Sequence, residues 1–213
     1  MRACTFLSDA AARIGRRKAS FATDKSGAAA LEFALVVPLL LACYFITMEA
    51  GQAIETSKKV GRIASTVADL ITRQQAMTPD EIKAIMHIGQ AIAGPYGRSV
   101  PTIVATGIQI ENGNARVVWS RKLSGGSFSA GDLANTTTVV PERLRVDGTF
   151  LVRVTADLDY RPVLTWSGAS GEEEAATGLG ALDRIFDKNG GLAMGDTYYL
   201  RPRQSATIPC PDC

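Results

Sequence analysis

The spacing of hydrophobic and polar positions changes along this chain and predicts where its elements lie. Residues 28–48 form a continuous apolar run, and apolar side chains recur at helical spacing through residues 49–75. Residues 102–110 and 115–123 are rich in Val, Ile and Thr, and residues 150–160 alternate between apolar and polar. We therefore expect an α+β fold in which one long helix precedes an antiparallel β-sheet.

The apolar run is long enough to cross a membrane. Residues 33–48 contain no charged side chain, and residues 28–31 extend them to about the 20 residues that span roughly 30 Å of hydrocarbon. We expect one transmembrane helix, with the chain beyond it outside the cytoplasm, because the basic residues before the run favour a cytoplasmic N-terminus. Those basic residues are Arg2, Arg13, Arg16, Arg17, Lys18 and Lys25.

A secretory signal peptide is the alternative interpretation of the apolar run. Such signals have an apolar region of about 7–15 residues, followed by small residues at the cleavage site. A cut after Ala50 or Ala53 would satisfy the second condition. The run is long for a signal, however, and the helical pattern continues through both positions, which favours a permanent anchor.

Beyond the apolar run, the helix is expected to continue as an amphipathic helix to about residue 75. Pro38 removes the backbone hydrogen bond to the carbonyl of Ala34 and should bend the helix there. We divide the chain into a basic leader (1–27), this helix (28–75) and an extracytoplasmic domain (76–213) whose sheet packs on the helix. The apolar stripe that would face the sheet consists of Val60, Ile63, Val67, Leu70 and Ile71.

Local signals place a second helix after the first. Thr78 and Glu81 have the spacing of a capping box, and Pro79 suits the first helical position. Gly94 and Pro95 should end this helix. Its apolar face would consist of Ile82, Ile85, Met86 and Ile92.

The remaining elements are expected to be strands and loops. Residues 111–114 contain Asn-Gly and predict a hairpin turn, whereas residues 125–130 read as a Gly/Ser loop. Residues 150–160 should form a central strand and residues 197–201 the last strand. Residues 166–186 read as an exposed loop followed by a short helix.

Little in this sequence indicates catalysis. The composition, 46% hydrophobic and 21% charged, is that of a folded protein, and a net charge of +2 does not point to nucleic acid. His87 is the single histidine, which excludes two-histidine metal sites. We also find no nucleophile elbow, phosphate-binding loop or dinucleotide fingerprint. We expect a protein that is not an enzyme and that needs no cofactor or metal.

Cys210 and Cys213 form a CxxC pair. Two cysteines cannot fill a tetrahedral zinc site alone, and a thioredoxin-like motif would have to begin a helix. In an oxidising compartment we expect a structural disulfide, either between Cys210 and Cys213 or with a partner. A redox or metal protein that uses this pair is the less favoured alternative.

Glu32 is the only charged residue within residues 28–48. A carboxylate beside membrane-length hydrocarbon is unfavourable, so a protein that has one there usually has a use for it. In one interpretation, Glu32 lies near the helix start, where the helix dipole favours an anion. In the other, Glu32 pairs with a positive group on a neighbouring chain, such as the new amine of Ala28 after a cut behind Gly27.

These residues resemble the TadE/TadG-like proteins of the tight-adherence (Flp) pilus system, a pseudopilin-like group related to type IV pilins. The resemblance is clearest over residues 20–75, and its motifs are residues 26–35, 38–40, 60–71 and 198–203. It implies a pilin-like fold and a role as a membrane-anchored minor pseudopilin or pilus-assembly factor. The implied location is the bacterial inner membrane, with the C-terminal domain in the periplasm.

The resemblance also implies a processing site and a set of partners. Some members are cut by a prepilin peptidase after a glycine, with glutamate at the fifth mature position, and here Gly27, Ala28 and Glu32 match. Phe33 departs from the tyrosine that follows this glutamate in the small pilins, and some larger relatives are not processed. The implied partners are inner-membrane lipid, other pilus-assembly proteins or pilins, and a prepilin peptidase. A signal-anchored periplasmic binding module with no pilus role is the alternative.

Overall fold

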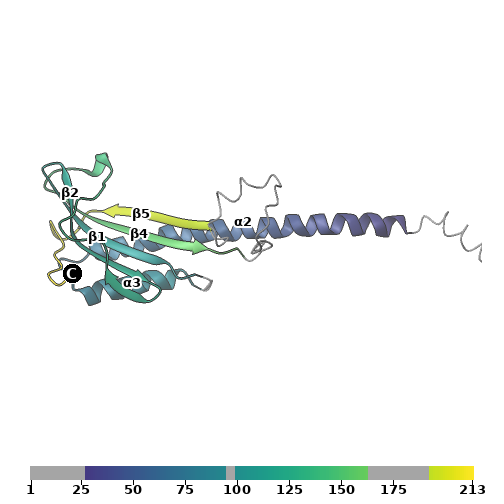
Figure 1. Ribbon diagram of the computed structural model, residues 1–213, viewed down its shortest axis with the longest axis horizontal. Coiled ribbons are helices and arrows are strands. Elements are labelled where there is room, and N and C mark those ends of the chain that lie inside the picture. The colour runs from purple at the N-terminus through teal and green to yellow at the C-terminus, as the bar shows by residue number, and fades with distance from the viewer. Residues whose placement is uncertain (1–26, 95–98, 163–191) are drawn as a thin grey trace, which may run out of the picture. The chain divides into compact units, whose positions relative to one another are not determined.

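The computed structural model describes residues 27–94, 99–162 and 192–213, and its fold is α+β, as expected. The chain divides into two compact units, Met1–Met48 and Glu49–Cys213. The leader before Gly27 and the helix expected within residues 166–186 lie outside the described residues. In chain order (Figure 1), the elements are α2 (Ala28–Thr72), α3 (Pro79–Ile92), β1 (Thr102–Glu111), β2 (Asn114–Ser124), β3 (Ser127–Ala130), the 3₁₀ turn η1 (Glu142–Leu144), β4 (Phe150–Tyr160) and β5 (Leu192–Leu200).

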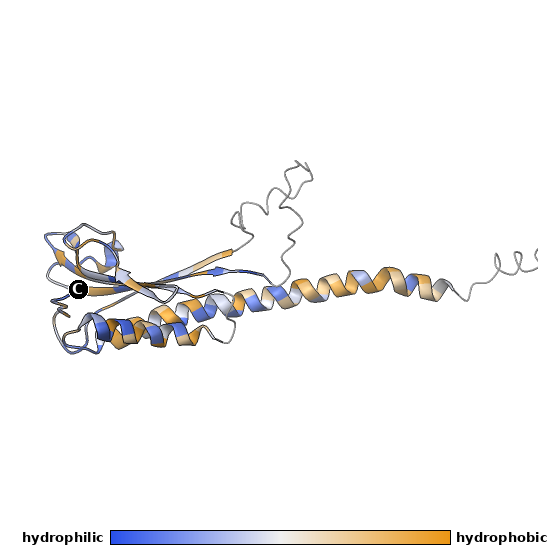
Figure 2. Cartoon of the chain, turned by 60° about the horizontal axis from the view of Figure 1, so that its bottom comes forward, coloured by the Kyte–Doolittle hydropathy of each residue, from blue (hydrophilic) through white to orange (hydrophobic). Residues whose placement is uncertain are grey.

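Helix α2 runs through both units, and we call residues 28–48 its first half and residues 49–72 its second half. The helix was expected to reach about residue 75 and ends at Thr72, and Pro38 lies inside it without ending it. Hydrophobic residues dominate the first half (Figure 2), whereas the second half alternates between hydrophobic and polar residues.

The second half of α2 contributes an apolar stripe to the core of the second unit. The prediction was wrong about Leu70, which is only half-buried. At about 100° per residue, the buried face is centred near Val60 and Ile71, so Leu70 falls at its edge. Ala64 and Ala68, which the prediction omitted, are fully buried instead. The buried stripe consists of Val60, Ile63, Ala64, Val67, Ala68 and Ile71.

Helix α3 begins as the sequence predicts. The Thr78 side chain accepts a hydrogen bond from the Glu81 amide, and the Glu81 carboxylate accepts one from the Thr78 amide at 2.8 Å, which completes the capping box. The helix ends at Ile92, slightly before the expected stop at Gly94. A Cβ placed on Gly89 would lie 2.5 Å from Val67 Cγ2, so this glycine permits the close approach of α3 to α2.

The five strands form one antiparallel sheet with the order β3-β2-β1-β4-β5. The predicted hairpin between β1 and β2 is confirmed, and its turn residues Asn112 and Gly113 have φ values of 50° and 74°. Residues 125–130 are not a plain loop, because Gly125 and Gly126 make a second tight turn and β3 pairs with the end of β2. The strand at residues 150–160 lies in the interior of the sheet, but β1 holds the middle place.

A β-bulge in β2 reverses the alternation of its side chains, so that residues of the same parity point to opposite faces of the sheet before and after the bulge. The pairing of β1 with β2 shifts after Gly107, where Val118 has no opposite residue. Trp119 therefore packs in the helix-side core, whereas Ala115, near the start of β2, packs on the opposite face. A Cβ on Gly107 would lie 2.5 Å from Trp119 Cε2, so the glycine makes room for the indole ring.

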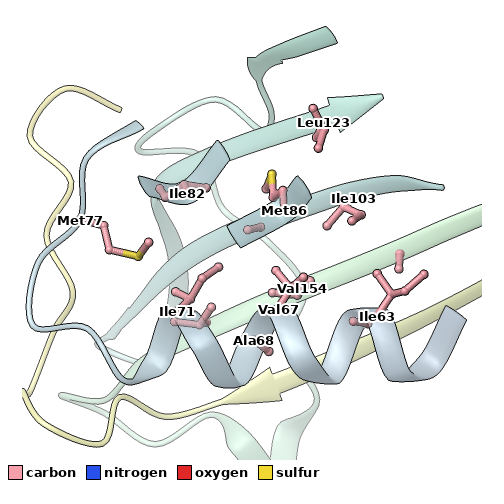
Figure 3. Close-up of a cluster of buried hydrophobic side chains, with 14 of the residues drawn as sticks. Ile63, Val67, Ala68, Ile71, Met77, Ile82, Met86, Ile103, Leu123 and Val154 are labelled. Carbon is pink, nitrogen blue, oxygen red and sulfur yellow. The ribbon is translucent and has the colours of Figure 1, made fainter. Parts of the chain in front are cut away.

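Two apolar clusters hold the layers of the second unit together. On one face of the sheet, α2 and α3 pack against side chains that include Ile103, Leu123 and Val154 (Figure 3). The other face is covered by residues 131–149, which we call the cover loop. The cover loop is fixed to the sheet, because its Thr138 amide donates to the Ala115 carbonyl at 3.0 Å. The second cluster consists of Ile108, Ile110, Ala115, Val140 and Leu151.

Candidate membrane and assembly segment

The first half of α2 exposes large apolar side chains on all of its sides. Leu39, Leu40 and Leu41 are consecutive, so they point in three directions about 100° apart, and all three are exposed. A helix that is apolar all round is suited to lipid or to other helices rather than to water. Among the described residues, α2 is the one helix long and apolar enough to cross a membrane. The exposed side chains are Leu31, Phe33, Leu35, Val36, Leu39, Leu40, Leu41, Tyr44, Phe45 and Ile46.

Glu32 lies on this exposed segment, just beyond the first turn of α2. The first turn itself contains no acidic residue, and the dipole effect of a helix falls off within that turn. The Glu32 side chain is exposed, and within the described residues no hydrogen bond or ion pair is seen for it. The carboxylate is therefore available to a group from outside the described part of this chain.

Gly27 sits at the junction before the helix. Its carbonyl accepts a hydrogen bond from the Leu31 amide at 3.1 Å, so the helical hydrogen bonds begin at this residue. Gly27 is exposed, and a Cβ placed on it would have no neighbour within 4 Å. The peptide bond between Gly27 and Ala28 is thus at the edge of the helix rather than inside it.

The second half of α2 is tied to the sheet at its first residue. The Tyr160 hydroxyl, at the end of β4, donates a short hydrogen bond to the Glu49 carboxylate. Further along the same helix, Lys59 Nζ lies 3.1 Å from Glu55 Oε1, an ion pair within α2. Sequence reasoning missed the first contact, because Glu49 and Tyr160 are 111 residues apart and no local pattern joins them. The Tyr160–Glu49 hydrogen bond joins the start of the second half of α2 to the end of β4.

The family model described as "TadE-like protein" matches residues 27–69. The chain carries a TadE-like segment. No curated protein and no solved structure matches the chain. The TadE-like family is associated with the tight-adherence pilus system and is not a family of enzymes. The match therefore agrees with the TadE/TadG-like resemblance of the sequence motifs.

The limits of the TadE-like segment coincide with structural features of α2. The match begins at Gly27, where the helical hydrogen bonding begins, and ends at Asp69, near the end of the helix. It therefore includes the exposed apolar half, Glu32 and most of the buried stripe. The apolar half of the segment indicates a single-pass membrane anchor.

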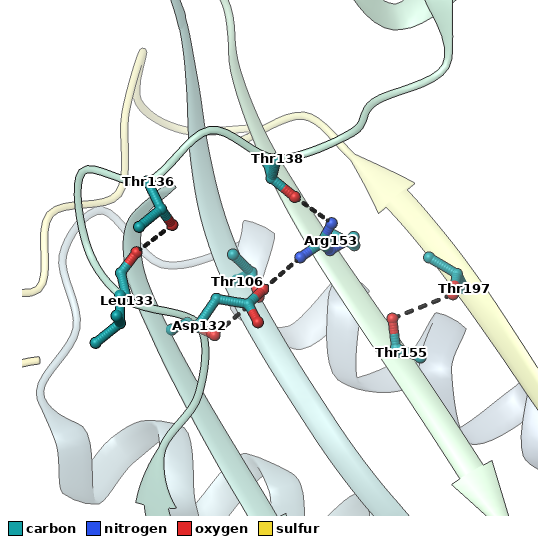
Figure 4. A network of polar contacts seen from close by, with 9 residues as sticks. Thr106, Asp132, Leu133, Thr136, Thr138, Arg153, Thr155 and Thr197 are labelled. Carbon is teal, nitrogen blue, oxygen red and sulfur yellow. Dashed lines mark hydrogen bonds and ion pairs between the residues drawn. The ribbon is translucent and has the colours of Figure 1, made fainter. Parts of the chain in front are cut away.

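Outside the TadE-like segment, the cover loop presents a groove on the sheet face opposite the helices (Figure 4). Arg153 of β4 is its central polar residue, since its guanidinium contacts Asp132 Oδ2 at 2.6 Å and Thr138 Oγ1 at 2.7 Å. Leu133 and Val139 line the same groove and are 76% and 81% exposed. Sequence reasoning did not find this groove, because it forms only when the cover loop folds over the sheet.

The cysteines and the histidine occupy separate places. Cys210 and Cys213 form a disulfide, with their Cα atoms 5.3 Å apart. Cys43 is free and exposed in the TadE-like segment. His87 is exposed on α3. Within the described ranges, no group of three or more His, Cys, Asp or Glu side chains could hold a metal ion.

Proposed function

We propose that this chain is a membrane-anchored minor pseudopilin or assembly factor of tight-adherence (Flp, type IVb) pili. The observation that carries the proposal is the TadE-like match over an exposed apolar helix that places Glu32 five residues beyond Gly27. The basic leader would lie in the cytoplasm, residues 28–48 in the inner membrane and the second unit in the periplasm.

The apolar half of α2 would serve both storage and assembly. In the bilayer, lipid satisfies the side chains on all sides of the helix. When subunits gather, the same side chains pack against the helices of other pilus-assembly proteins or pilins. Glu32 then sets the register, because an ionised carboxylate surrounded by hydrocarbon is unfavourable unless it lies beside a positive group.

Processing by a prepilin peptidase would create that positive group. A cut between Gly27 and Ala28 removes the leader and leaves an amine on Ala28. The exposure of Gly27 supports access by a peptidase. In this proposal, Glu32 of one chain pairs with the Ala28 amine of its neighbour.

The pairing role is tested by Glu32→Gln, which removes the charge and keeps the shape of the side chain. We expect normal membrane insertion and a loss of most surface pili, measured by electron microscopy and by shearing pili from cells. Glu55→Gln, on the same helix beyond the apolar half, is the matched control and should leave pilus output unchanged. Normal piliation with Glu32→Gln would contradict the pairing role.

Cleavage is tested separately by the mass of the protein isolated from its host. A processed chain begins at Ala28, and Gly27→Val should leave the leader in place. Recovery of an intact leader from wild-type cells would refute cleavage but not anchoring. Normal pili in cells that lack the whole chain would instead support the periplasmic binding module with no pilus role.

A further inference from the structure

The segment after β5, which we call the strap (residues 201–213), contacts the ends of both helices. The Arg203 amide donates to the Thr72 carbonyl at 2.9 Å, at the last residue of α2. The Arg203 guanidinium lies 2.6 Å from the Asp69 carboxylate. Between the helices, the Met77 amide donates to the Pro209 carbonyl at 3.0 Å, and Figure 3 shows Met77 beside the yellow strap. The strap thus holds the connection between α2 and α3.

The strap also completes the core. Ile208 is fully buried within the cluster that joins the helices to the sheet. Its carbonyl accepts a hydrogen bond from Trp119 Nε1 at 2.8 Å, and this indole is itself buried. A buried donor that loses its acceptor is costly, so release of the strap would expose Ile208 and leave Trp119 without this bond.

The disulfide closes the turn that ends the strap. The Cys213 amide donates to the Cys210 carbonyl at 3.2 Å, and both cysteines pack against the core. Within this turn, the Asp212 carbonyl accepts a hydrogen bond from Arg121 Nη2 at 2.9 Å. Arg121 belongs to β2, so the turn attaches the strap to the sheet as well as to the helices.

We propose that the strap is an oxidation-dependent latch, in which closure of the Cys210–Cys213 disulfide locks the strap over the core. The covalent step is thiol–disulfide exchange with a disulfide-bearing oxidant. One cysteine thiolate attacks the oxidant disulfide, which forms a mixed disulfide and releases one oxidant thiolate. The second cysteine thiolate then attacks the sulfur of the first cysteine in this mixed disulfide. This step forms the Cys210–Cys213 bond and releases the other oxidant thiolate. Two electrons pass to the oxidant, and the two thiol protons pass to solvent.

The latch acts by shaping the turn before the strap docks. With the bond closed, the Asp212 carbonyl is held in position for Arg121, and the two sulfurs lie on the apolar core. With the bond open, the turn samples many conformations and loses entropy when it docks. Reduction therefore weakens the strap as a whole, including the contact between Pro209 and Met77. The proposal does not depend on a role in pili, because it concerns the folding of this chain alone.

The test compares the full-length protein in detergent before and after treatment with a phosphine reductant. Thermal unfolding should occur about 5 °C lower after reduction, as expected for a short closed loop in a domain of this size. Amide hydrogen exchange should become faster at Met77, whose protection depends on the strap. Exchange at Ile108, in the middle strand of the sheet, should stay slow.

Three variants separate the latch from a general loss of stability. The double variant Cys210→Ser/Cys213→Ser should unfold at the temperature of the reduced wild type and should not respond to reductant. Cys43→Ser should respond to reductant as the wild type does. Arg121→Met should unfold at a lower temperature and show a smaller shift on reduction, because the contact held by the disulfide is gone. An unchanged unfolding temperature or unchanged Met77 exchange after reduction would overturn the proposal.

Discussion

Both halves of α2 carry many large apolar side chains, but these side chains are exposed in the first half and largely buried in the second. In the first half, Leu35 is 72% exposed, whereas in the second half Ile63 is 0% exposed. The first half is apolar on every side, and the second half carries one apolar stripe and a polar face. The difference shows that the apolar side chains of the second half are buried by its own domain, whereas those of the first half are left for lipid or other chains to cover.

The largest expected effect comes from shortening a side chain in the buried stripe. Ile63→Ala should lower the free energy of unfolding by about 2–5 kcal/mol, because it leaves a cavity in a packed core. Leu35→Ala, in the first half, should leave that free energy unchanged. Chemical unfolding of the full-length protein in detergent, followed by tryptophan fluorescence, to which the buried Trp119 contributes, measures both. Equal losses would show that the two halves do not differ as described.

A charge in the exposed half should act on membrane insertion instead. Leu39→Arg places a cation near the middle of the apolar run, which costs about 3 kcal/mol of insertion free energy. The fraction of protein that resists carbonate extraction from membranes should therefore fall. Leu133→Arg, at an exposed apolar residue of the cover loop, is the control and should keep its membrane fraction. Full membrane retention of Leu39→Arg would argue against a spanning segment.

A smaller effect is expected where α3 approaches the buried half. Gly89→Ala would place Cβ 2.5 Å from Val67 Cγ2 and 3.1 Å from Ile103 Cδ1. We expect the variant to lose about 1–3 kcal/mol of unfolding free energy through overpacking. Gly94→Ala, where the nearest atom is 3.5 Å away, should be almost neutral and serves as the control. A stable Gly89→Ala protein would mean that the two helices can move apart at little cost.

The smallest effect distinguishes two glycines of α2 itself. Gly51 has open space around its Cα, so Gly51→Ala should raise stability by about 0.5–1 kcal/mol through helix propensity. At Gly61 a Cβ would lie 2.7 Å from Asp196 Oδ2, on β5. Gly61→Ala must displace that carboxylate, which also accepts a hydrogen bond from the Thr197 amide at 2.8 Å. The variant should therefore gain less stability than Gly51→Ala, or lose stability. Unfolding curves of the two variants measure the difference. Identical gains in unfolding free energy would show that the Asp196 side chain moves aside at no cost.

The parts of the fold that were predictable have local causes. The capping box of Thr78 and Glu81 and the Asn112-Gly113 turn each depend on residues close in sequence, and both are present. The anchor segment was also predictable, because length and charge alone describe a membrane-spanning helix. Strand β3 was missed because a short Ser-rich stretch becomes a strand only through its pairing with β2.

The features that sequence reasoning missed depend on contacts between distant residues. The Tyr160–Glu49 hydrogen bond, the groove beneath the cover loop and the contact of Trp119 with Ile208 each join separate elements. A disulfide of Cys210 and Cys213 could be expected, but its place over the core could not, since that requires the whole second unit to be assembled. For Glu32, its position within the apolar run predicted a functional role, and its proposed partner belongs to a neighbouring chain.

The bulge at Val118 makes the length of β2 matter more than the identity of the extra residue. The Val118 side chain is partly exposed, so many replacements should be accepted there. Deleting the residue is different, because Ala115 and Val117 would then turn towards the helices and polar neighbours would turn towards the cover loop. In evolutionary terms, this position should tolerate substitution but not insertion or deletion, because a change of one residue reverses which face of the sheet the side chains before the bulge point to.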